Sequence, residues 1–452
     1  MISRKDGVRR ERSKRLMWTY IPELLATPVP RYTSYPTAAD FGPLEHGVIE
    51  RAIAGASGDI SLYLHIPFCE KICFYCGCNT AVSGKRARVE AYLAALHQEI
   101  ATIGSLLPQG ARVRRIALGG GSPNAILTGE FLGLVEALHA HLPLAAPEWS
   151  IELDPRSLTA EWSAVLGTTG ITRASMGVQT FAAHCQKAIG REQSLTMICR
   201  STDWLRKGGV TSLNFDLMYG LPHQSEADLE DSLEMTRKLG ADRIAVFGYA
   251  HVPHLVPRQT MIREGDLPGA AARFTMASEA HRILTAGGYQ AIGFDHFALP
   301  HDPMARAAQT GRLRRNFQGF TDDPSEVLIG MGASAIHGFP GLLAQNEKHT
   351  ATYRQMSEAG RLSAGHGIVR STEDQRRGAV IEALLCRGEA VLPDDLLAGV
   401  ADRLARFTDE GLASLRGRHL AIAPAGLPYA RVIAALFDAY RAAAPRKFSS
   451  AI

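Results

Sequence analysis

From residue 61 onward, short apolar runs alternate with longer amphipathic stretches. The apolar runs are typical of buried strands, and apolar residues at helical spacing indicate helices between them. This alternation predicts βα units and a parallel sheet. We expect strands at 61–66, 113–118, 149–153, 173–178, 213–218 and 244–249, and helices at about 88–105, 130–142, 157–168, 183–190 and 226–239.

Six such units are too few for a closed eight-stranded barrel, so the pattern predicts an α/β fold built as an open, three-quarter (β/α)6 barrel. Reactive loops in such a scaffold gather at the C-terminal ends of the strands. A further helix is expected near 270–287. Loop-like motifs follow it at 293–297, 314–319 and 330–336.

The two ends of the chain have different patterns. Residues 1–60 combine a basic leader with an extended, proline-rich segment, which we expect to dock on the main domain at 61–365. Met17 is an alternative start of translation. The Ala- and Leu-rich sequence from about 366 to 452 predicts a small, mainly helical C-terminal domain that resembles a winged helix. We expect a short strand at 419–423 and a final helix at 428–441 within it.

Composition restricts the class of protein. The chain has 452 residues, of which 46% are hydrophobic and 21% charged, as is ordinary for a globular enzyme. It lacks both the roughly 20-residue apolar run that spans a bilayer and the apolar core of a signal peptide, so we expect a cytoplasmic protein that binds no membrane. The net charge of +4 is modest, and acidic residues interrupt the basic leader, which argues against nucleic-acid binding.

Four of the seven cysteines follow the first predicted strand within ten positions: Cys69, Cys73, Cys76 and Cys78. So dense a group of soft thiolate ligands indicates an iron–sulfur or zinc site rather than disulfides. The C-x3-C-x2-C spacing differs from the paired hooks of structural zinc sites. Three cysteines on a [4Fe–4S] cluster leave one iron open for a further ligand, whereas a four-thiolate zinc site that includes Cys78 is the alternative.

Glycine and polar residues follow the other predicted strands. Gly119-Gly120-Gly121-Ser122 follows the second strand, where the lack of Cβ atoms lets the backbone approach a ligand closely. Glu152 or Asp216 could accept a hydrogen bond from a ribose hydroxyl, and Arg191 could bind a carboxylate. Further candidates at strand ends are Asp154, Gln179, Tyr249, Ala250 and His251.

The cysteine motif after the first strand resembles the signature of the radical S-adenosylmethionine (SAM) superfamily, in which a cluster and SAM together produce a 5′-deoxyadenosyl radical. The similarity extends further. The motifs Arg31-Tyr-Thr-Ser-Tyr-Pro-Thr, Gly293-Phe-Asp-His-Phe and Arg315-Asn-Phe-Gln-Gly-Phe resemble those of the oxygen-independent coproporphyrinogen III oxidase family, over nearly the whole chain after residue 30.

That resemblance implies one [4Fe–4S] cluster, two SAM molecules and a monomeric enzyme. Its substrate is expected to be coproporphyrinogen III, two propionates of which become the vinyl groups of protoporphyrinogen IX. The electron donor and the final acceptor are not identified by the sequence. Two alternatives are a haem-binding chaperone and a radical SAM enzyme that acts on another tetrapyrrole. Cys78 favours the oxidase, because the chaperones usually have an aromatic residue there.

The resemblance also assigns individual residues. The cluster ligands are expected to be Cys69, Cys73 and Cys76. The cluster-bound SAM is expected to contact Tyr63, Gly120, Glu152 and Ile336. The second SAM is expected to contact Tyr75, Gly121, Ser122, Gln179, Arg191, Asp216 and Ala250. Catalytic roles are implied for Tyr63, His65, Cys78 and Gln318. Candidate partners of the substrate carboxylates are Arg31, Arg312, Arg314 and Arg315. Three positions differ from the residues usual in the family, namely Asn124, Thr180 and Gly190.

Overall fold

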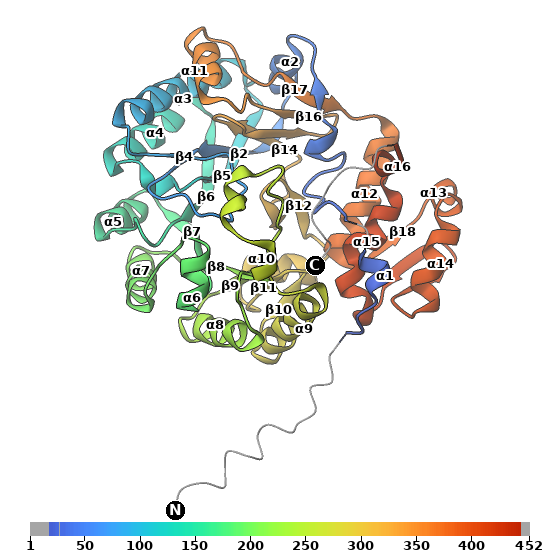
Figure 1. Ribbon diagram of the computed structural model, residues 1–452. Helices are drawn as coiled ribbons and strands as arrows, with labels where there is room; N and C mark the ends of the chain where they lie inside the picture. Colours follow the sequence, from blue (N-terminus) through green and yellow to red (C-terminus); the bar gives the residue numbers. More distant parts are fainter. Residues whose placement is uncertain (1–17, 27, 444–452) are drawn as a thin grey trace, which may run out of the picture.

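The computed structural model describes residues 18–26 and 28–443, so the basic leader lies outside the described residues. Within these ranges, thirteen strands form one sheet (Figure 1), in the order β1-β17-β16-β15-β14-β2-β5-β6-β7-β8-β9-β11-β10, where the edge strand β1 is Gly42–Pro43. The run from β14 to β9 is parallel throughout. Its members are β2 (Gly58–Ile66), β5 (Ala111–Gly120), β6 (Leu144–Leu153), β7 (Ile171–Gln179), β8 (Ser212–Tyr219), β9 (Arg243–Gly248) and β14 (Val327–Met331).

Helices lie along the outer side of the parallel strands (Figure 1). The predicted α/β alternation is confirmed, and the strands and helices lie close to their expected bounds. The sequence pattern missed α7, although Ser194 caps its first turn and its buried residues follow a helical spacing. The helices are α3 (Arg86–Leu106), α4 (Thr128–His141), α5 (Ala160–Thr168), α6 (Ala183–Ala188), α7 (Leu195–Lys207), α8 (Glu226–Lys238) and α9 (Ala270–Ala286).

The register of the first two parallel strands determines where the candidate site lies. Strand β2 pairs with β5 from Gly58 opposite Ala111 to Ile66 opposite Gly120. The loop that follows β2 therefore emerges beside the glycines that end β5. The side chains of Leu62 and Leu64 in β2 are almost fully buried, which anchors this register because a slip of one residue would turn them outward.

The three motifs that the pattern left as loops contain short strands, so this expectation was wrong. Each is part of an antiparallel hairpin whose members span only three to five residues, too short for a clear alternation of apolar and polar positions. The hairpin strands are β10 (Gln290–Ile292), β11 (His296–Ala298), β12 (Arg314–Asn316), β13 (Gly319–Thr321), β15 (Ile336–Phe339), β16 (Leu342–Gln345) and β17 (His366–Val369).

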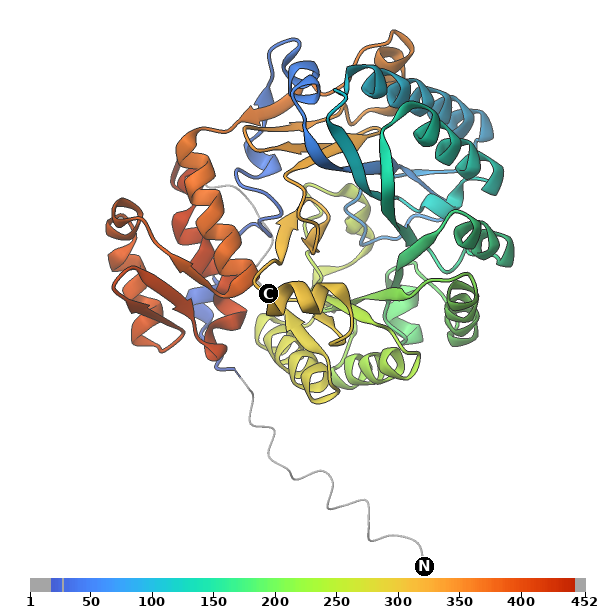
Figure 2. The ribbon, with the colours of Figure 1, turned by 180° about the vertical axis from the view of Figure 1, so that it is seen from behind.

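The C-terminal part packs beside the sheet (Figures 1 and 2). Its longest helix begins with a capping box between Ser371 and Asp374 and ends at Gly388, which has a left-handed conformation. The expected strand near 419–423 pairs with two strands that the pattern missed, and the expected final helix is divided into short turns around Pro428. The elements are α12 (Thr372–Arg387), β18 (Glu389–Val391), α13 (Asp394–Ala398), α14 (Ala401–Asp409), β19 (Ala413–Arg416), β20 (His419–Ile422), α15 (Ala430–Ala434) and α16 (Ala439–Ala443).

The proline-rich N-terminal segment lies between the sheet and the C-terminal part. Arg31 Nη2 donates to the carbonyl oxygen of Gly248 at the end of β9, at 3.0 Å. On the other side, the hydroxyl of Tyr32 donates to the carboxylate of Asp438 at 2.8 Å. These contacts tie the segment to both neighbours. Among the described residues, none of the helices is long and apolar enough to cross a membrane.

Candidate functional site

The cysteine loop leaves the C-terminal end of β2. Cys69 ends the short strand β3 (Phe68–Cys69), which pairs with β4 (Ala81–Val82), and the loop between these strands carries the other three cysteines. Cys73 is buried, Cys69 and Cys76 are partly buried, and Cys78 is exposed. The backbone N–H of Cys78 donates to Sγ of Cys76 at 3.4 Å. Three buried or partly buried thiols are therefore presented by one short stretch of chain.

Two arginines face the most buried of these thiols. Arg156 Nη2 and Arg191 Nη1 each lie 3.3 Å from Sγ of Cys73. Guanidinium groups stabilise a neighbouring thiolate and offset the negative charge of a thiolate-ligated cluster. The donor set and its charges thus fit an iron–sulfur cluster held by three cysteines. Arg156 was not predicted, although it follows the end of a predicted strand by only a few residues.

Arg191 is buried and fixed by the ends of two strands. Its Nη1 lies 3.2 Å from Oδ2 of Asp154, while Nε and Nη2 donate to the carbonyl oxygen of Gly177 at 3.1 and 2.6 Å. Burial alone would raise the pKa of Asp154, but the guanidiniums of Arg191 and Arg156 together lower it. The result is a charged pair at the ends of β6 and β7 that remains ionised.

The glycine run ends β5 in a close approach between strands. Gly120 has φ of 106°, and a Cβ atom there would lie 2.4 Å from Cε1 of His65, so a side chain does not fit. The N–H of Gly120 donates to Oε2 of Glu152 at 3.1 Å. Beyond it, the N–H of Ser122 donates to the carbonyl oxygen of Phe68 at 2.7 Å. The run therefore connects the cysteine loop to Glu152.

Two carboxylates lie at the ends of β6 and β8. Burial and the nearby Asp216 raise the pKa of Glu152 to about 7. Asp216 accepts hydrogen bonds from Ser175 Oγ at 2.9 Å and from Asn214 Nδ2 at 2.8 Å, but burial still raises its pKa. A cavity in this region is lined by both Glu152 and Gln318. The structure thus brings together one residue predicted to bind SAM and one predicted to face the substrate.

His65 is held as a neutral ring. Burial lowers its pKa, and Nδ1 lies 3.2 Å from the hydroxyl of Tyr63. On the other side, Nε2 lies 3.2 Å from the carbonyl oxygen of Asn79 and 3.4 Å from Oγ of Ser334. Two of the predicted catalytic residues are therefore in direct contact, and the ring orientation is fixed by the loop after the cysteines.

A network of buried hydrogen bonds holds the backbone of His65 in place. The hydroxyl of Tyr92 donates to the carbonyl oxygen of His65 at 2.7 Å and accepts from the N–H of Ala333 at 3.0 Å. The carboxylate of Glu99 accepts from the N–H of Gly332 at 2.6 Å and from the hydroxyl of Tyr353 at 2.7 Å. Sequence analysis missed this network, although Glu99 interrupts the apolar face of a long helix and so gives a signal.

We expect Glu99→Gln to lower the free energy of unfolding by about 1–3 kcal/mol, because an amide group would face the donor Nδ2 of Asn346, which lies 2.8 Å away. Burial raises the pKa of Glu99 from 4.5 to about 7. The folded protein therefore binds more protons than the unfolded chain in this interval, so wild-type stability falls as the pH rises through it. Urea unfolding of both proteins between about pH 5 and 8 measures this slope. An equal slope in the variant would contradict the assignment.

Two residues of the predicted second SAM site meet at one buried glutamine. Gln259 Nε2 donates to the carbonyl oxygens of Tyr75 at 2.9 Å and of Ala250 at 3.1 Å. Gln179 ends β7 with φ of 65°, a left-handed conformation. Ile336, which is expected to contact the cluster-bound SAM, is the first residue of β15 and pairs with Gln345 of β16. Gln259 was not predicted, because its contact with Tyr75 joins positions 184 residues apart in the sequence.

The three departures from the usual family residues have local explanations. Gly190 has φ of 64°, a conformation that asparagine also tolerates. Thr180 Oγ1 accepts from the N–H of Ala182 at 3.1 Å, a local turn contact that an aspartate side chain also makes. Asn124 is buried and donates from Nδ2 to the carbonyl oxygen of Asp154 at 2.9 Å. The contact of Asn124 fixes the chain directly after β6, and the contact of Thr180 fixes the turn directly after β7.

The four candidate arginines separate into two pairs. Arg315 Nη2 donates to the carbonyl oxygen of Arg31 at 3.0 Å, which places these two side by side. Arg314 Nε lies 3.6 Å from Oε1 of Glu382, and Arg312 is exposed and bonded to Thr310. The first pair lies beside the C-terminal end of β9, because Arg31 also donates to the carbonyl oxygen of Gly248.

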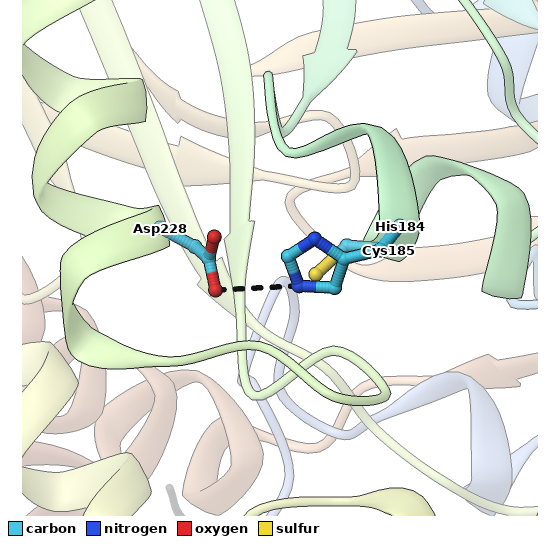
Figure 3. Close-up of side chains that lie close together, drawn as sticks. All are labelled: His184, Cys185 and Asp228. Atoms are coloured by element: carbon cyan, nitrogen blue, oxygen red, sulfur yellow. Dashed lines mark ion pairs between the residues drawn. The ribbon is translucent and has the colours of Figure 1, made fainter.

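A second group of metal-type donors lies between α6 and α8 (Figure 3), and it consists of His184, Cys185 and Asp228. His184 Nε2 lies 3.4 Å from Oδ2 of Asp228. The same oxygen accepts from the N–H and the hydroxyl of Ser225, at 2.8 and 2.6 Å, and so caps α8. Helix capping and a half-exposed ion pair account for this group.

Comparison with known proteins agrees with these observations. Residues 63–236 match the family model described as the radical SAM superfamily. The oxygen-independent coproporphyrinogen III oxidase of Cereibacter sphaeroides is 41% identical over 431 residues, which cover 92% of this chain and 95% of that protein. The protein of the same name from Paracoccus denitrificans is 41% identical over 434 residues, with the same coverage.

A solved structure extends the similarity to three dimensions. The structure titled as coproporphyrinogen III oxidase (HemN) from Escherichia coli, a radical SAM enzyme, is 34% identical, with a TM-score of 0.88. The alignment covers 94% of this chain and 100% of that chain. Membership of the superfamily implies an iron–sulfur cluster and SAM, which fit the three-cysteine loop. The chain therefore belongs to the oxygen-independent coproporphyrinogen III oxidase family of the radical SAM superfamily.

Proposed function

We propose that this enzyme converts two propionate groups of coproporphyrinogen III into the vinyl groups of protoporphyrinogen IX, with release of two molecules of carbon dioxide, in haem biosynthesis. The observation that carries the proposal is the three-cysteine loop beside the glycine run, in a chain that aligns almost end to end with relatives named for this reaction. Each conversion removes one hydrogen atom and one electron from the substrate. An external donor is therefore required for the electron that cleaves SAM, and an external acceptor for the electron that leaves the substrate.

We assign the cluster to Cys69, Cys73 and Cys76. When bound, a [4Fe–4S] cluster with an open iron supplies the electron that cleaves SAM and so makes hydrogen abstraction from an unactivated carbon possible. Arg156 and Arg191 contribute positive charge beside the sulfur of Cys73, which offsets the negative charge of a cluster bound there. Cys78 contributes its backbone N–H to Cys76 rather than a metal bond.

The cluster-bound SAM is assigned to Tyr63, Gly120, Glu152 and Ile336. In this arrangement the absence of a side chain at Gly120 leaves room for close backbone approach, and Glu152 provides a carboxylate for a hydroxyl or amino group. Tyr63 and His65 fix one another, so that the wall of the site keeps its shape.

A second SAM is assigned to the neighbouring strand ends. The residues that support it are linked to one another: Gln259 joins Tyr75 to Ala250, and Arg191 contacts both Asp154 and the end of β7. Gly121, Ser122, Gln179 and Asp216 belong to the same set of strand ends. Gln318 lines the cavity that also contains Glu152, which supports its assignment to the substrate side.

Anaerobic turnover of the reconstituted protein tests the proposal. With a reductant, SAM and coproporphyrinogen III, we expect the protein to form 5′-deoxyadenosine, carbon dioxide and protoporphyrinogen IX. Liquid chromatography and mass spectrometry detect the products. Because two propionates are converted, two molecules of SAM should be consumed for each product formed. Formation of 5′-deoxyadenosine without any vinyl product would refute the substrate. Methyl transfer, or stable haem binding without turnover, would show a different function.

A further inference from the structure

A cavity lies where the end of β9 meets α9, the N-terminal segment and the C-terminal part. Three arginines from three separate elements line it, namely Arg31, Arg273 and Arg431. Aromatic rings form much of the remaining wall: Trp18, Tyr219, Tyr249, Phe274, Phe294 and Phe297. A space with flat apolar walls and several guanidinium groups is suited to a ligand that combines a planar apolar body with anionic groups.

Arg273 differs from an ordinary structural arginine. Its Nη2 donates to the carbonyl oxygen of Tyr249 at 2.6 Å, whereas its Nε is buried and has no hydrogen-bond partner among the described residues. Within that part of the chain, the structure gives this side chain no ion pair with a carboxylate. A partly buried guanidinium without an anionic partner carries a substantial desolvation cost.

The surroundings of Arg273 increase this cost. Burial lowers its pKa, and the positive charge of Arg31 acts in the same direction. Among the described residues that line the cavity, Asp295 is the only carboxylate, and its Oδ1 lies 2.7 Å from Nδ1 of His296. A carboxylate that entered the cavity would therefore meet Arg273 with its charge still uncompensated.

We propose that Arg273 binds a propionate carboxylate of the tetrapyrrole substrate. The inference rests on the proposed function, and it adds a binding residue from α9 that sequence analysis did not identify. The hydrogen bond to Tyr249 holds the guanidinium beside Ala250, a residue assigned to the second SAM site. The bound carboxylate would thus anchor the substrate next to the assigned SAM positions, with the aromatic walls against its pyrrole rings.

Binding of coproporphyrin III and of its tetramethyl ester tests this role directly. Arg273→Gln keeps a donor for the Tyr249 carbonyl but removes the charge. We expect it to weaken binding of the free acid about tenfold or more, measured by fluorescence titration, and to leave binding of the ester unchanged. In turnover, KM for coproporphyrinogen III should rise more than kcat falls.

Arg282→Gln is the matched control, because Arg282 lies on the same helix but is exposed and bonded to Glu279 at 2.6 Å. It should bind both probes as the wild type does. Arg273→Lys retains the charge and should bind the acid more tightly than Arg273→Gln. Equal weakening of acid and ester, or an unchanged KM in Arg273→Gln, would overturn the role of Arg273. Failure of the wild type to convert the substrate would instead overturn the proposed function.

Discussion

Cys73→Ser should prevent assembly of the cluster and reduce turnover to the background level. A serine oxygen is a poor ligand for iron in such a cluster, and the two guanidinium donors now 3.3 Å from the sulfur would face a neutral hydroxyl. Iron and sulfide content, visible absorbance and the formation of 5′-deoxyadenosine after anaerobic reconstitution measure the effect. All three should be lost together.

Cys78→Ser is the control within the same loop. The contact between Cys78 and Cys76 uses the backbone N–H of Cys78, which a serine retains. We therefore expect this variant to keep its iron and its visible absorbance, whatever the change in turnover. If both variants lost the metal equally, Cys78 would be a ligand. Zinc in place of iron in the wild type would then support the four-thiolate alternative.

The parallel strands were predictable because each carries several buried apolar residues. Residues such as Leu62 and Leu64 form continuous apolar runs, and the helices between the runs are long enough to show a helical spacing. The hairpins after α9 were not predictable in this way. Strands such as Arg314–Asn316 span only three residues, which is too short for an alternation of apolar and polar positions to be recognised in the sequence.

The candidate site divides along the same line. Glu152, Gln179 and Asp216 could be selected because they lie in or directly after the C-terminal parts of predicted parallel strands, whose ends meet at one edge of the sheet. By contrast, the contact between Tyr92 and His65, and that between Arg273 and Tyr249, join different elements. Such pairs become visible only when the register and the helix packing are known. The family resemblance identified individual candidate residues, whereas the structure showed which other residues hold them in place.

Asp322→Ala should destabilise the protein by about 3–5 kcal/mol, because it removes a buried carboxylate from the buried Arg173 and the partly buried Arg115 and leaves them only the more exposed Glu148 in common. Oδ1 of Asp322 lies 2.8 Å from Nη1 of Arg115 and 3.0 Å from Nη1 of Arg173, and the side chains of Asp322 and Arg173 are each 8% exposed. These contacts tie the chain after β13 to β5 and β7. The hairpin that carries Gln318 should therefore loosen, and KM for coproporphyrinogen III should rise in parallel.

The dependence on pH and an exposed control separate this effect from a general loss of charge. Burial would raise the pKa of Asp322, but Arg173 and Arg115 hold it well below its ordinary value of 3.8. The ion pairs of Asp322 therefore stabilise the wild type fully above pH 3.8, and this stabilisation is lost as the pH falls below that value. Asp59→Ala removes a carboxylate that lies 2.9 Å from Arg112 but is 39% exposed, so it should cost less than about 1 kcal/mol. Equal destabilisation of the two variants in urea unfolding would show that burial does not strengthen the Asp322 contacts.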